Sequence, residues 1–250
     1  MALGLVGFDR RALGGAACLV GIDEVGRGCL AGPVVAAAIR CEADFYSSSW
    51  CRRHSRQVDD SKRLRAVQRA EVVRRFTHAF RKKWIRIGYG SASVEEIGRL
   101  NIYHATTLAM KRALAGVLEL QREDLWSSGG GGLRPEIPIL IDGRPIRHFP
   151  HAHEGIVKGD QRSLAIALAG IHAKEWRDRY MRDLDREVPG YGFAAHKGYG
   201  TAGHVEALQR KGPTRHHRPG FLKNVGGSII AGASASQGSL FPAEAIQSES

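Results

Sequence analysis

The sequence predicts an α/β fold in which a mixed β-sheet is flanked by helices. Two short apolar runs lie close together near the N-terminus, and later apolar runs alternate with long segments of helical periodicity. A tight glycine-rich link joins the first two runs and favours neighbouring, antiparallel strands. Strands that then alternate with helices indicate a sheet with helices packed on its faces.

The strands follow from short apolar runs. We expect them at residues 17–22, 33–39, 84–89 and 137–141, with a short fifth strand at 155–158. The run at 84–89, WIRIGY, alternates large apolar with basic residues, which is typical of a strand with one solvated face. The first run is apolar and bounded by glycine, so it predicts a buried strand.

The helices follow from apolar residues that recur every three or four positions. Segments with mostly helical character are 64–80, 101–120, 163–181 and 202–210. Ser93 and Glu96 form the S-x-x-E pattern of a capping box, which predicts the start of a further short helix.

Four other segments lack a clear period. We expect residues 1–16 to be a loose lead-in, 41–57 to be a loop, and 127–135 (SSGGGGLRP) to be a flexible loop. Residues 226–250 turn to Gly, Ala and Ser, which predicts a disordered tail.

The charge of the chain is strongly basic. Lys and Arg total 37 against 25 Asp and Glu, which gives a formal net charge of +12 over 250 residues and a pI near 10.0. This balance favours a polyanionic partner, usually nucleic acid. The alternative, in which the charge only aids solubility, stays open on composition alone.

The four cysteines are Cys18, Cys29, Cys41 and Cys51, and they show neither CxxC spacing nor an accompanying histidine cluster. We therefore expect free thiols in a reducing compartment rather than a zinc site or a disulfide framework. No apolar run approaches the length of a membrane span, and the N-terminal residues lack the basic region of a secretory signal. We expect a cytoplasmic protein without a membrane partner.

Four acidic residues stand at the ends of apolar runs or the starts of helices: Asp23, Glu24, Asp142 and Asp160. Each has an ordinary structural explanation by itself. Asp142 begins a common Asp-Gly turn, Asp160 could cap the next helix, and the Asp23-Glu24 pair could simply reach solvent. In a chain this basic, however, four acids at strand ends would repel a phosphate backbone, and two like charges about 4 Å apart cost on the order of 4 kcal/mol near a protein surface.

A divalent cation would remove this repulsion. Mg²⁺ and Mn²⁺ prefer hard oxygen ligands, and two such ions about 4 Å apart can clamp the attacking and leaving oxygens of phosphodiester hydrolysis. Neighbours on a regular strand face opposite sides, so Asp23 and Glu24 can share a site only if the strand ends or bends there. Gly26 allows such a bend.

The same turn also matches a dinucleotide-binding pattern, because Gly26, Gly28 and Ala31 follow G-x-G-x-x-[GA]. Two carboxylates precede the turn where a pyrophosphate would lie, and the next segment, PVVAAAI, is typical of a strand and not of a helix. We therefore reject a dinucleotide site.

Several motifs together carry a family resemblance. The segment GIDEVGRGCLAGPVVAAAI (21–39) resembles the N-terminal signature of ribonuclease HII, the type 2 ribonuclease H family. Further similar segments are DDSKRL (59–64), NIYHATTLAMKRA (101–113), ILIDG (139–143), KGDQRSLAIALAGIHAKEWRDRYM (158–181) and HKGYGTAGHVEAL (196–208). The similarity runs, with interruptions, from about residue 18 to 221.

The resemblance implies an RNase H-like fold and a metal-dependent endonuclease. Its expected substrates are RNA/DNA hybrids and DNA with embedded ribonucleotides, cut on the 5′ side of the ribonucleotide to leave 3′-hydroxyl and 5′-phosphate ends. The family's catalytic acids, which would hold two Mg²⁺ or Mn²⁺ ions, fall on Asp23, Glu24, Asp142 and Asp160. Its ribonucleotide-contacting element falls on Gly26, Arg27 and Gly28, its junction-sensing tyrosine on Tyr199, and phosphate contacts on Lys62, Lys158 and Ser163. A purely structural role for Tyr199 in its glycine-rich turn stays open.

By the same resemblance, residues 17–188 form the catalytic domain and 189–225 a small helical extension that completes the substrate site. In the tail, Gln237 to Phe241 (QGSLF) resembles the peptides by which bacterial replication and repair proteins bind the sliding clamp, although glycine stands where leucine is preferred. We expect a monomer.

Two alternative functions remain. A non-catalytic nucleic-acid-binding protein would keep the basic surface and could lose the acids without losing affinity. A type 3 ribonuclease H usually carries an additional N-terminal domain, and the first predicted strand here begins at residue 17.

Overall fold

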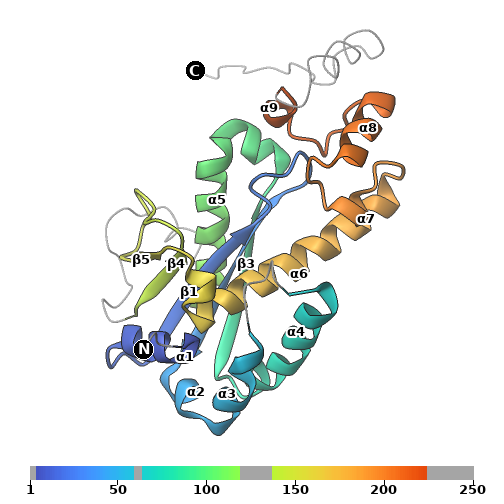
Figure 1. Cartoon of the computed structure of the whole chain (residues 1–250). Helices are drawn as coiled ribbons and strands as arrows, with labels where there is room; N and C mark the ends of the chain where they lie inside the picture. Colours follow the sequence, from blue (N-terminus) through green and yellow to red (C-terminus); the bar gives the residue numbers. More distant parts are fainter. Residues whose placement is uncertain (1–3, 59–63, 119–136, 224–250) are drawn as a thin grey trace.

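The computed structural model describes residues 4–58, 64–118 and 137–223. In these residues the sheet has five strands in the order β3-β2-β1-β4-β5 (Figure 1). The strands are β1 Cys18–Val25, β2 Val34–Glu42, β3 Ile85–Ala92, β4 Ile139–Asp142 and β5 Glu154–Ile156. The first three pair antiparallel, whereas β4 and β5 run parallel to β1, so the predicted mixed sheet is confirmed.

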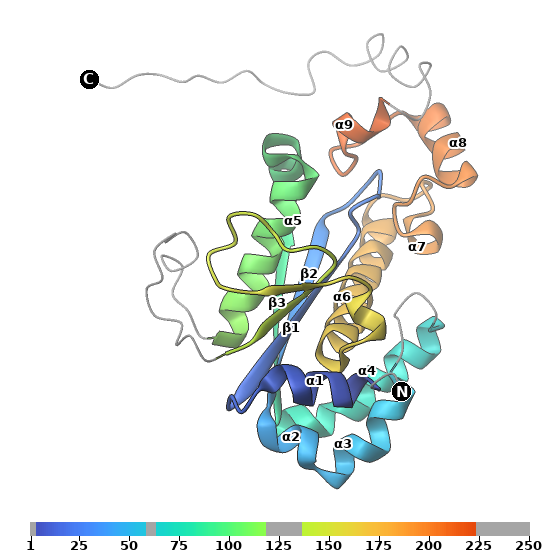
Figure 2. The ribbon, with the colours of Figure 1, turned by 60° about the vertical axis from the view of Figure 1, so that its left-hand side comes forward.

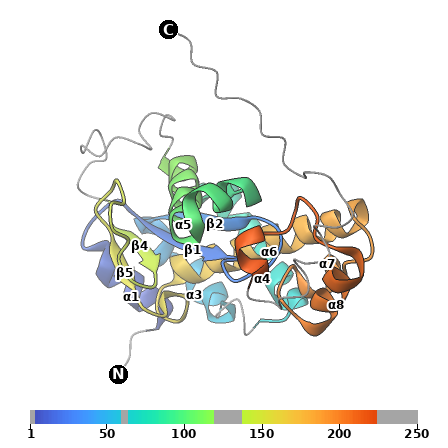
Figure 3. The same cartoon turned by 90° about the horizontal axis from the view of Figure 1, so that it is seen from above.

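The helices are α1 Leu5–Leu13, α2 Ala43–Ser47, α3 Ser49–His54, α4 Ala66–Arg81, α5 Val94–Leu118, α6 Leu164–Glu187, α7 Phe193–His196, α8 Ala202–Lys211 and α9 Pro219–Leu222. There are also two single 3₁₀ turns in the described residues: η1 Ser55–Gln57, which follows α3, and η3 Gly159–Gln161, which precedes α6. Figure 3 shows α5 on one side of the sheet and α6 with α4 on the other.

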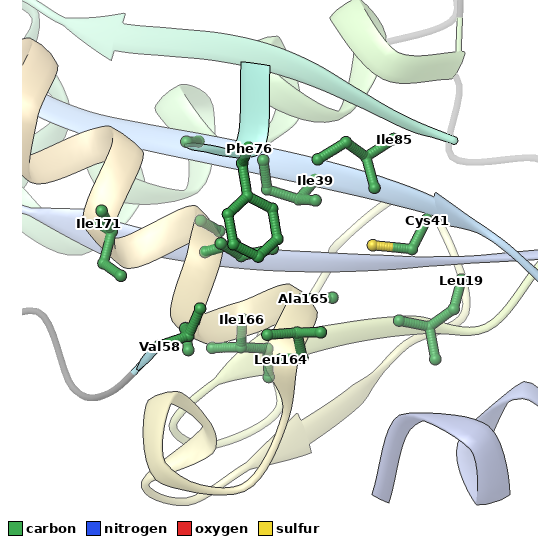
Figure 4. Packing of buried hydrophobic residues seen from close by; sticks show 14 of the residues in the cluster. Leu19, Ile39, Cys41, Val58, Phe76, Ile85, Leu164, Ala165, Ile166 and Ile171 are labelled. Atoms are coloured by element: carbon green, nitrogen blue, oxygen red, sulfur yellow. The ribbon is translucent and has the colours of Figure 1, made fainter. Parts of the chain in front are cut away.

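Alternate residues of the buried strands fill two separate cores. On β2, Ala36 and Ala38 belong to the cluster that packs under α5, whereas Ala37 and Ile39 belong to the cluster under α6 and α4. This alternation is the expected period of two along a strand. Figure 4 shows the ring of Phe76, from α4, within the cluster under α6 and α4.

The two helices predicted between residues 93 and 120 are confirmed as two segments of α5. Glu96 Oε2 accepts the Ser93 N–H at 2.9 Å, and Ser93 Oγ accepts the Glu96 N–H at 3.2 Å, so the capping box forms. The helix breaks at Asn101, where φ is 63° and ψ is 168°. The Asn101 side chain then caps the second segment by accepting the N–H of Tyr103 at 2.9 Å.

Two predictions about irregular segments are wrong. Residues 5–13 form a helix instead of a loose lead-in, because apolar residues along α1, among them Leu5 and Phe8, pack against the core. Residues 43–57 form α2, α3 and η1 instead of a loop, because Phe45, Tyr46 and Cys51 are buried in that same core. The predictions for 127–135 and 226–250 lie outside the described residues.

All four cysteines are buried free thiols, as predicted. Among the described residues, no helix is both long enough and apolar enough to cross a membrane.

The C-terminal helices lie at the far end of α6, beside the connection from β1 to β2 (Figures 1 and 2). The Leu30 N–H donates to the Gly198 carbonyl at 2.8 Å, and Ala31 forms a β-bridge with His217. Two segments that are far apart in the sequence therefore meet at this end of the molecule.

We predict that Gly21→Ala destabilises the fold by about 3 kcal/mol or more, because β1 and α6 approach closely at this position. A Cβ atom at Gly21 would lie 2.5 Å from the Ala165 carbonyl carbon and 2.5 Å from the Ile166 nitrogen, which are backbone atoms. Urea denaturation measures the change. Gly203→Ala is the control, because nothing lies within 4 Å of its added Cβ, and it should leave the stability unchanged or slightly higher.

Candidate active site

The sheet register brings two of the predicted acids together. Strands β1 and β4 are parallel neighbours, with Ile22 paired to Ile141. Asp23 and Asp142 are the next residues on these two strands, so both stand at the same carboxyl edge of the sheet. In α/β sheets this edge is where ligands usually bind.

The turn before α6 adds a third acid to this edge. Strand β5 pairs its Ile156 with Asp142, and a few residues later the Gly159 N–H donates to Asp142 Oδ1 at 2.6 Å. Asp160 follows directly in η3 and is 6% exposed. The hydrogen bond therefore fixes the backbone beside Asp160 against the end of β4.

Asp23 lies at the centre of the cluster and is 7% exposed. Its Oδ1 accepts the Glu24 N–H at 2.7 Å. Burial raises the pKa of the Asp23 carboxyl well above its usual range, and the negative charges of Glu24, Asp142 and Asp160 raise it further. Asp23 therefore lies within electrostatic range of the other three predicted acids.

The condition under which Asp23 and Glu24 would lie on one face is not met, because β1 neither ends nor loses its regular pairing at the acid pair. The strand continues through Val25, and Glu24 is paired with Ala36, so the alternation of side chains is kept there. The backbone turns at Gly26, where φ is 90°. Glu24 Oε1 lies 3.2 Å from the Arg27 guanidinium, which forms an ion pair with it across this turn.

The donor chemistry fits Mg²⁺ or Mn²⁺, because these cations prefer carboxylate oxygens. Asp23 is buried and feels the negative charge of three other acids. A divalent cation bound there would relieve the repulsion on its carboxylate. As the side chains stand, no three His, Cys, Asp or Glu residues of the described chain are close enough to hold a metal ion. Glu24 is turned toward Arg27, and one oxygen of Asp142 accepts the Gly159 N–H.

Four of the predicted substrate-contacting residues lie where the β1–β2 connection meets the turn between α7 and α8: Gly26, Arg27, Gly28 and Tyr199. Arg27 has a half-exposed side chain, and nothing lies within 4 Å of a Cβ atom placed on Gly28, so this turn is open to solvent. Tyr199 is 40% exposed on the turn between α7 and α8, next to Gly198, which accepts the Leu30 N–H. The structure thus brings Tyr199 to the loop that follows Gly28.

The comparisons with known proteins identify the family. The family model for ribonuclease HII matches residues 20–224. A ribonuclease HII of Synechococcus sp. (strain JA-3-3Ab) is 43% identical over 216 residues, which cover 86% of each chain. A ribonuclease HII of Cereibacter sphaeroides (strain ATCC 17029 / ATH 2.4.9) is 43% identical over 83% of this chain and 85% of its own.

The chain belongs to the ribonuclease HII family. It is therefore a ribonuclease H, an endonuclease that hydrolyses phosphodiester bonds.

Solved structures confirm the RNase H-like fold. Ribonuclease H2 from Pyrococcus horikoshii OT3 superposes with a TM-score of 0.61 at 17% identity, over 85% of this chain and 99% of its own. Bst-RNase HIII, solved in complex with Mn²⁺, gives a TM-score of 0.60 at 17% identity, over 89% of this chain and 72% of its own. Both similarities concern the fold alone.

The three predicted phosphate contacts of this ribonuclease have different surroundings. Lys158 is exposed in the left-handed conformation (φ 54°), two residues before Asp160. Ser163 is fully buried, and its hydroxyl caps α6 by accepting the Ile166 N–H at 3.2 Å. Because Ser163 is the cap, the alternative in which Asp160 caps this helix is wrong. Lys62 lies outside the described residues.

Asp9 is a buried residue next to the site that the sequence did not indicate. Its Oδ2 accepts the Ala165 N–H at 2.9 Å and the Tyr46 hydroxyl at 3.0 Å, so it helps to fix the first turn of α6 behind Asp160. Burial raises the pKa of Asp9 to about 6. No sequence signal pointed to it, because its partners are 156 and 37 residues away.

We predict that Asp9 makes the protein less stable as the pH rises from about 4 to about 6. A carboxyl whose pKa is raised on folding contributes stability while it is protonated, and this contribution is lost as the pH passes through the folded pKa near 6. The loss is roughly 3 kcal/mol at most. Asp9→Asn should remove this part of the pH dependence of the unfolding free energy.

Urea denaturation at four pH values from about 4 to about 7 measures this effect, because the range spans the interval in which the contribution is lost. The exposed Asp44→Asn is the matched control and should keep the parent's pH dependence. An Asp9→Asn variant with the same pH dependence as the parent would contradict the assignment.

Proposed function

We propose that this ribonuclease hydrolyses RNA in RNA/DNA hybrids and cuts on the 5′ side of ribonucleotides embedded in duplex DNA, leaving 3′-hydroxyl and 5′-phosphate ends. The observation that carries the proposal is the placement of Asp23 and Asp142 at the carboxyl edge of β1 and β4, where the charges of Glu24, Asp142 and Asp160 all act on Asp23. These acids lie in a chain whose net charge of +12 suits a nucleic acid, beside an open glycine-rich turn.

Asp23, Glu24, Asp142 and Asp160 are the residues that would hold two Mg²⁺ or Mn²⁺ ions. When bound, such ions make water a stronger nucleophile at neutral pH and neutralise charge that develops on the phosphate and the leaving oxygen. The protein holds the carboxylates in place through the strand register, and the Gly159 N–H orients Asp142. No covalent enzyme intermediate is needed for this chemistry.

The neighbouring residues position the nucleic acid. The backbone of Gly26 and Gly28 and the guanidinium of Arg27 contact the ribonucleotide and its phosphate, and recognition of the 2′-hydroxyl distinguishes RNA from DNA. Tyr199 packs against the deoxyribose that follows. Lys158 and Lys62 contact phosphates, and Ser163, being buried, contributes by fixing the start of α6.

A sliding clamp is the proposed protein partner, through Gln237 to Phe241. One structural neighbour, a ribonuclease HII of Archaeoglobus fulgidus, was solved in complex with PCNA; it superposes with a TM-score of 0.60 at 20% identity, over 82% of this chain and 94% of its own. The peptide itself lies outside the described residues. Loss of clamp capture on deletion of residues 237–241 would support the proposal, and no capture by the whole chain would refute it.

We predict that Asp142→Asn abolishes cleavage of a DNA duplex that holds one ribonucleotide. The change removes a negative charge but keeps an oxygen that can accept the Gly159 N–H, so the fold should persist. Loss of a direct metal ligand should exceed the roughly 10- to 100-fold loss that residues supporting such ligands give. The assay is gel analysis of the nick position with Mg²⁺ or Mn²⁺, and with a chelator.

The parent should nick on the 5′ side of the ribonucleotide, and chelator should prevent it. The exposed Asp44→Asn variant should cut like the parent. Cleavage of long hybrids without this nick would keep the nuclease and refute the junction roles of Arg27 and Tyr199. Binding without any cleavage, unchanged in Asp142→Asn, would refute the proposed chemistry and favour a non-catalytic binding protein.

A further inference from the structure

Two arginines are buried where the C-terminal helices meet the β1–β2 connection. Arg177, on α6, is 0% exposed, and Arg218, directly before α9, is 1% exposed. Charged side chains are almost never fully buried unless their charge is satisfied. Within the described part of the chain neither guanidinium forms an ion pair, and both donate to backbone carbonyls instead.

Arg177 joins the loop after Gly28 to the turn before Tyr199. Its Nε donates to the Pro33 carbonyl at 3.0 Å, its Nη2 to the Ala31 carbonyl at 3.0 Å, and its Nη1 to the Lys197 carbonyl at 2.8 Å. A Cβ atom on Gly26 would overlap the Arg177 side chain. Glycine at position 26 is therefore required by the packing of Arg177 as well as by the positive φ of the turn.

Arg218 holds the same loop at both of its ends. Its Nη1 donates to the Arg27 carbonyl at 2.9 Å, and its Nε and Nη2 both donate to the Gly32 carbonyl, at 2.9 and 2.7 Å. Its own backbone N–H donates to the Leu30 carbonyl at 2.7 Å. Burial lowers the pKa of Arg218 to about 10, so the guanidinium stays charged at neutral pH.

We propose that Arg177 and Arg218 are positioning residues for ribonucleotide recognition. Arg177 fixes the loop after Gly28 against the turn before Tyr199, and Arg218 fixes the two ends of that loop, at Arg27 and Gly32. This inference rests on the proposed function, in which Arg27 contacts the ribonucleotide and Tyr199 the next deoxyribose. The distance between the two contacts must then match one nucleotide step. A duplex with one ribonucleotide offers a single productive register, whereas a long hybrid offers many.

The chemistry of the guanidinium explains why arginine is needed at both positions. Its planar fork presents five N–H donors in fixed directions, so one side chain can hold two or three backbone carbonyls at once. A lysine would keep the positive charge but would concentrate its three donors on one nitrogen. Replacing either arginine by lysine should therefore loosen the loop after Gly28, or its placement against the turn before Tyr199, without removing the charge.

The test compares Arg177→Lys and Arg218→Lys with the parent. Arg179→Lys is the matched control, because Arg179 is exposed on α6 two residues from Arg177. KM and kcat are measured on a DNA duplex with one ribonucleotide and on a long RNA/DNA hybrid, and thermal melting verifies the fold. We expect kcat/KM on the single-ribonucleotide duplex to fall roughly 10- to 100-fold, as misplacement of about 1 Å can cause. The hybrid should lose much less, and the control should match the parent.

Equal losses of kcat/KM on both substrates would indicate a merely structural role and overturn the inference. Lysine variants with the same kcat/KM as the control would also overturn it. A parent that cuts neither substrate would refute the proposed function itself. If both lysine variants fail to fold, Gly198→Ala is tested in their place. Its Cβ would lie 2.6 Å from the Ala31 carbonyl oxygen and would push the turn before Tyr199 away from the loop after Gly28. Selective loss on the single-ribonucleotide duplex then supports the inference, and no selective loss overturns it.

Discussion

The repulsion between carboxylates at the ends of two adjacent parallel strands is the constraint on which the site depends. Asp23 and Asp142 are neighbours through the β1–β4 register, and the turn before α6 adds Asp160. Burial removes the water that would screen these charges, and it raises the pKa of Asp23 in the same direction as its acidic neighbours do. Such a group of charges is costly for the fold by itself, and the proposed divalent cations would remove that cost.

Two backbone N–H donors and the guanidinium of Arg27 stabilise these carboxylates. The Gly159 N–H donates to Asp142, the Glu24 N–H to Asp23, and Arg27 forms an ion pair with Glu24. Arg27 belongs to the turn proposed to contact the ribonucleotide. A bound metal ion would compete with Arg27 for Glu24, and bound substrate would compete with Glu24 for Arg27. The acidic cluster and the recognition turn are therefore coupled through Glu24.

The sequence predicted the strands and the four acids because both depend on local patterns. Asp23 and Asp142 stand at the ends of short apolar runs, which identify strand ends without knowledge of the pairing. Asp9 and Arg218 could not be predicted in this way, because their partners are up to 191 residues away and only the folded chain brings them near. The helices at 43–57 were missed because their apolar residues are too few to show a period.

The most direct test of the central claim compares the unfolding free energy of the parent and Asp142→Asn at pH 8, in chelator and in Mn²⁺. If repulsion among the acids dominates, the variant should be the more stable protein in chelator, because one negative charge has been removed from the cluster. Mn²⁺ should then stabilise the parent, as a ligand that binds only the folded state does, and stabilise the variant much less. A variant that is less stable in chelator, or that gains as much from Mn²⁺ as the parent, would contradict the account.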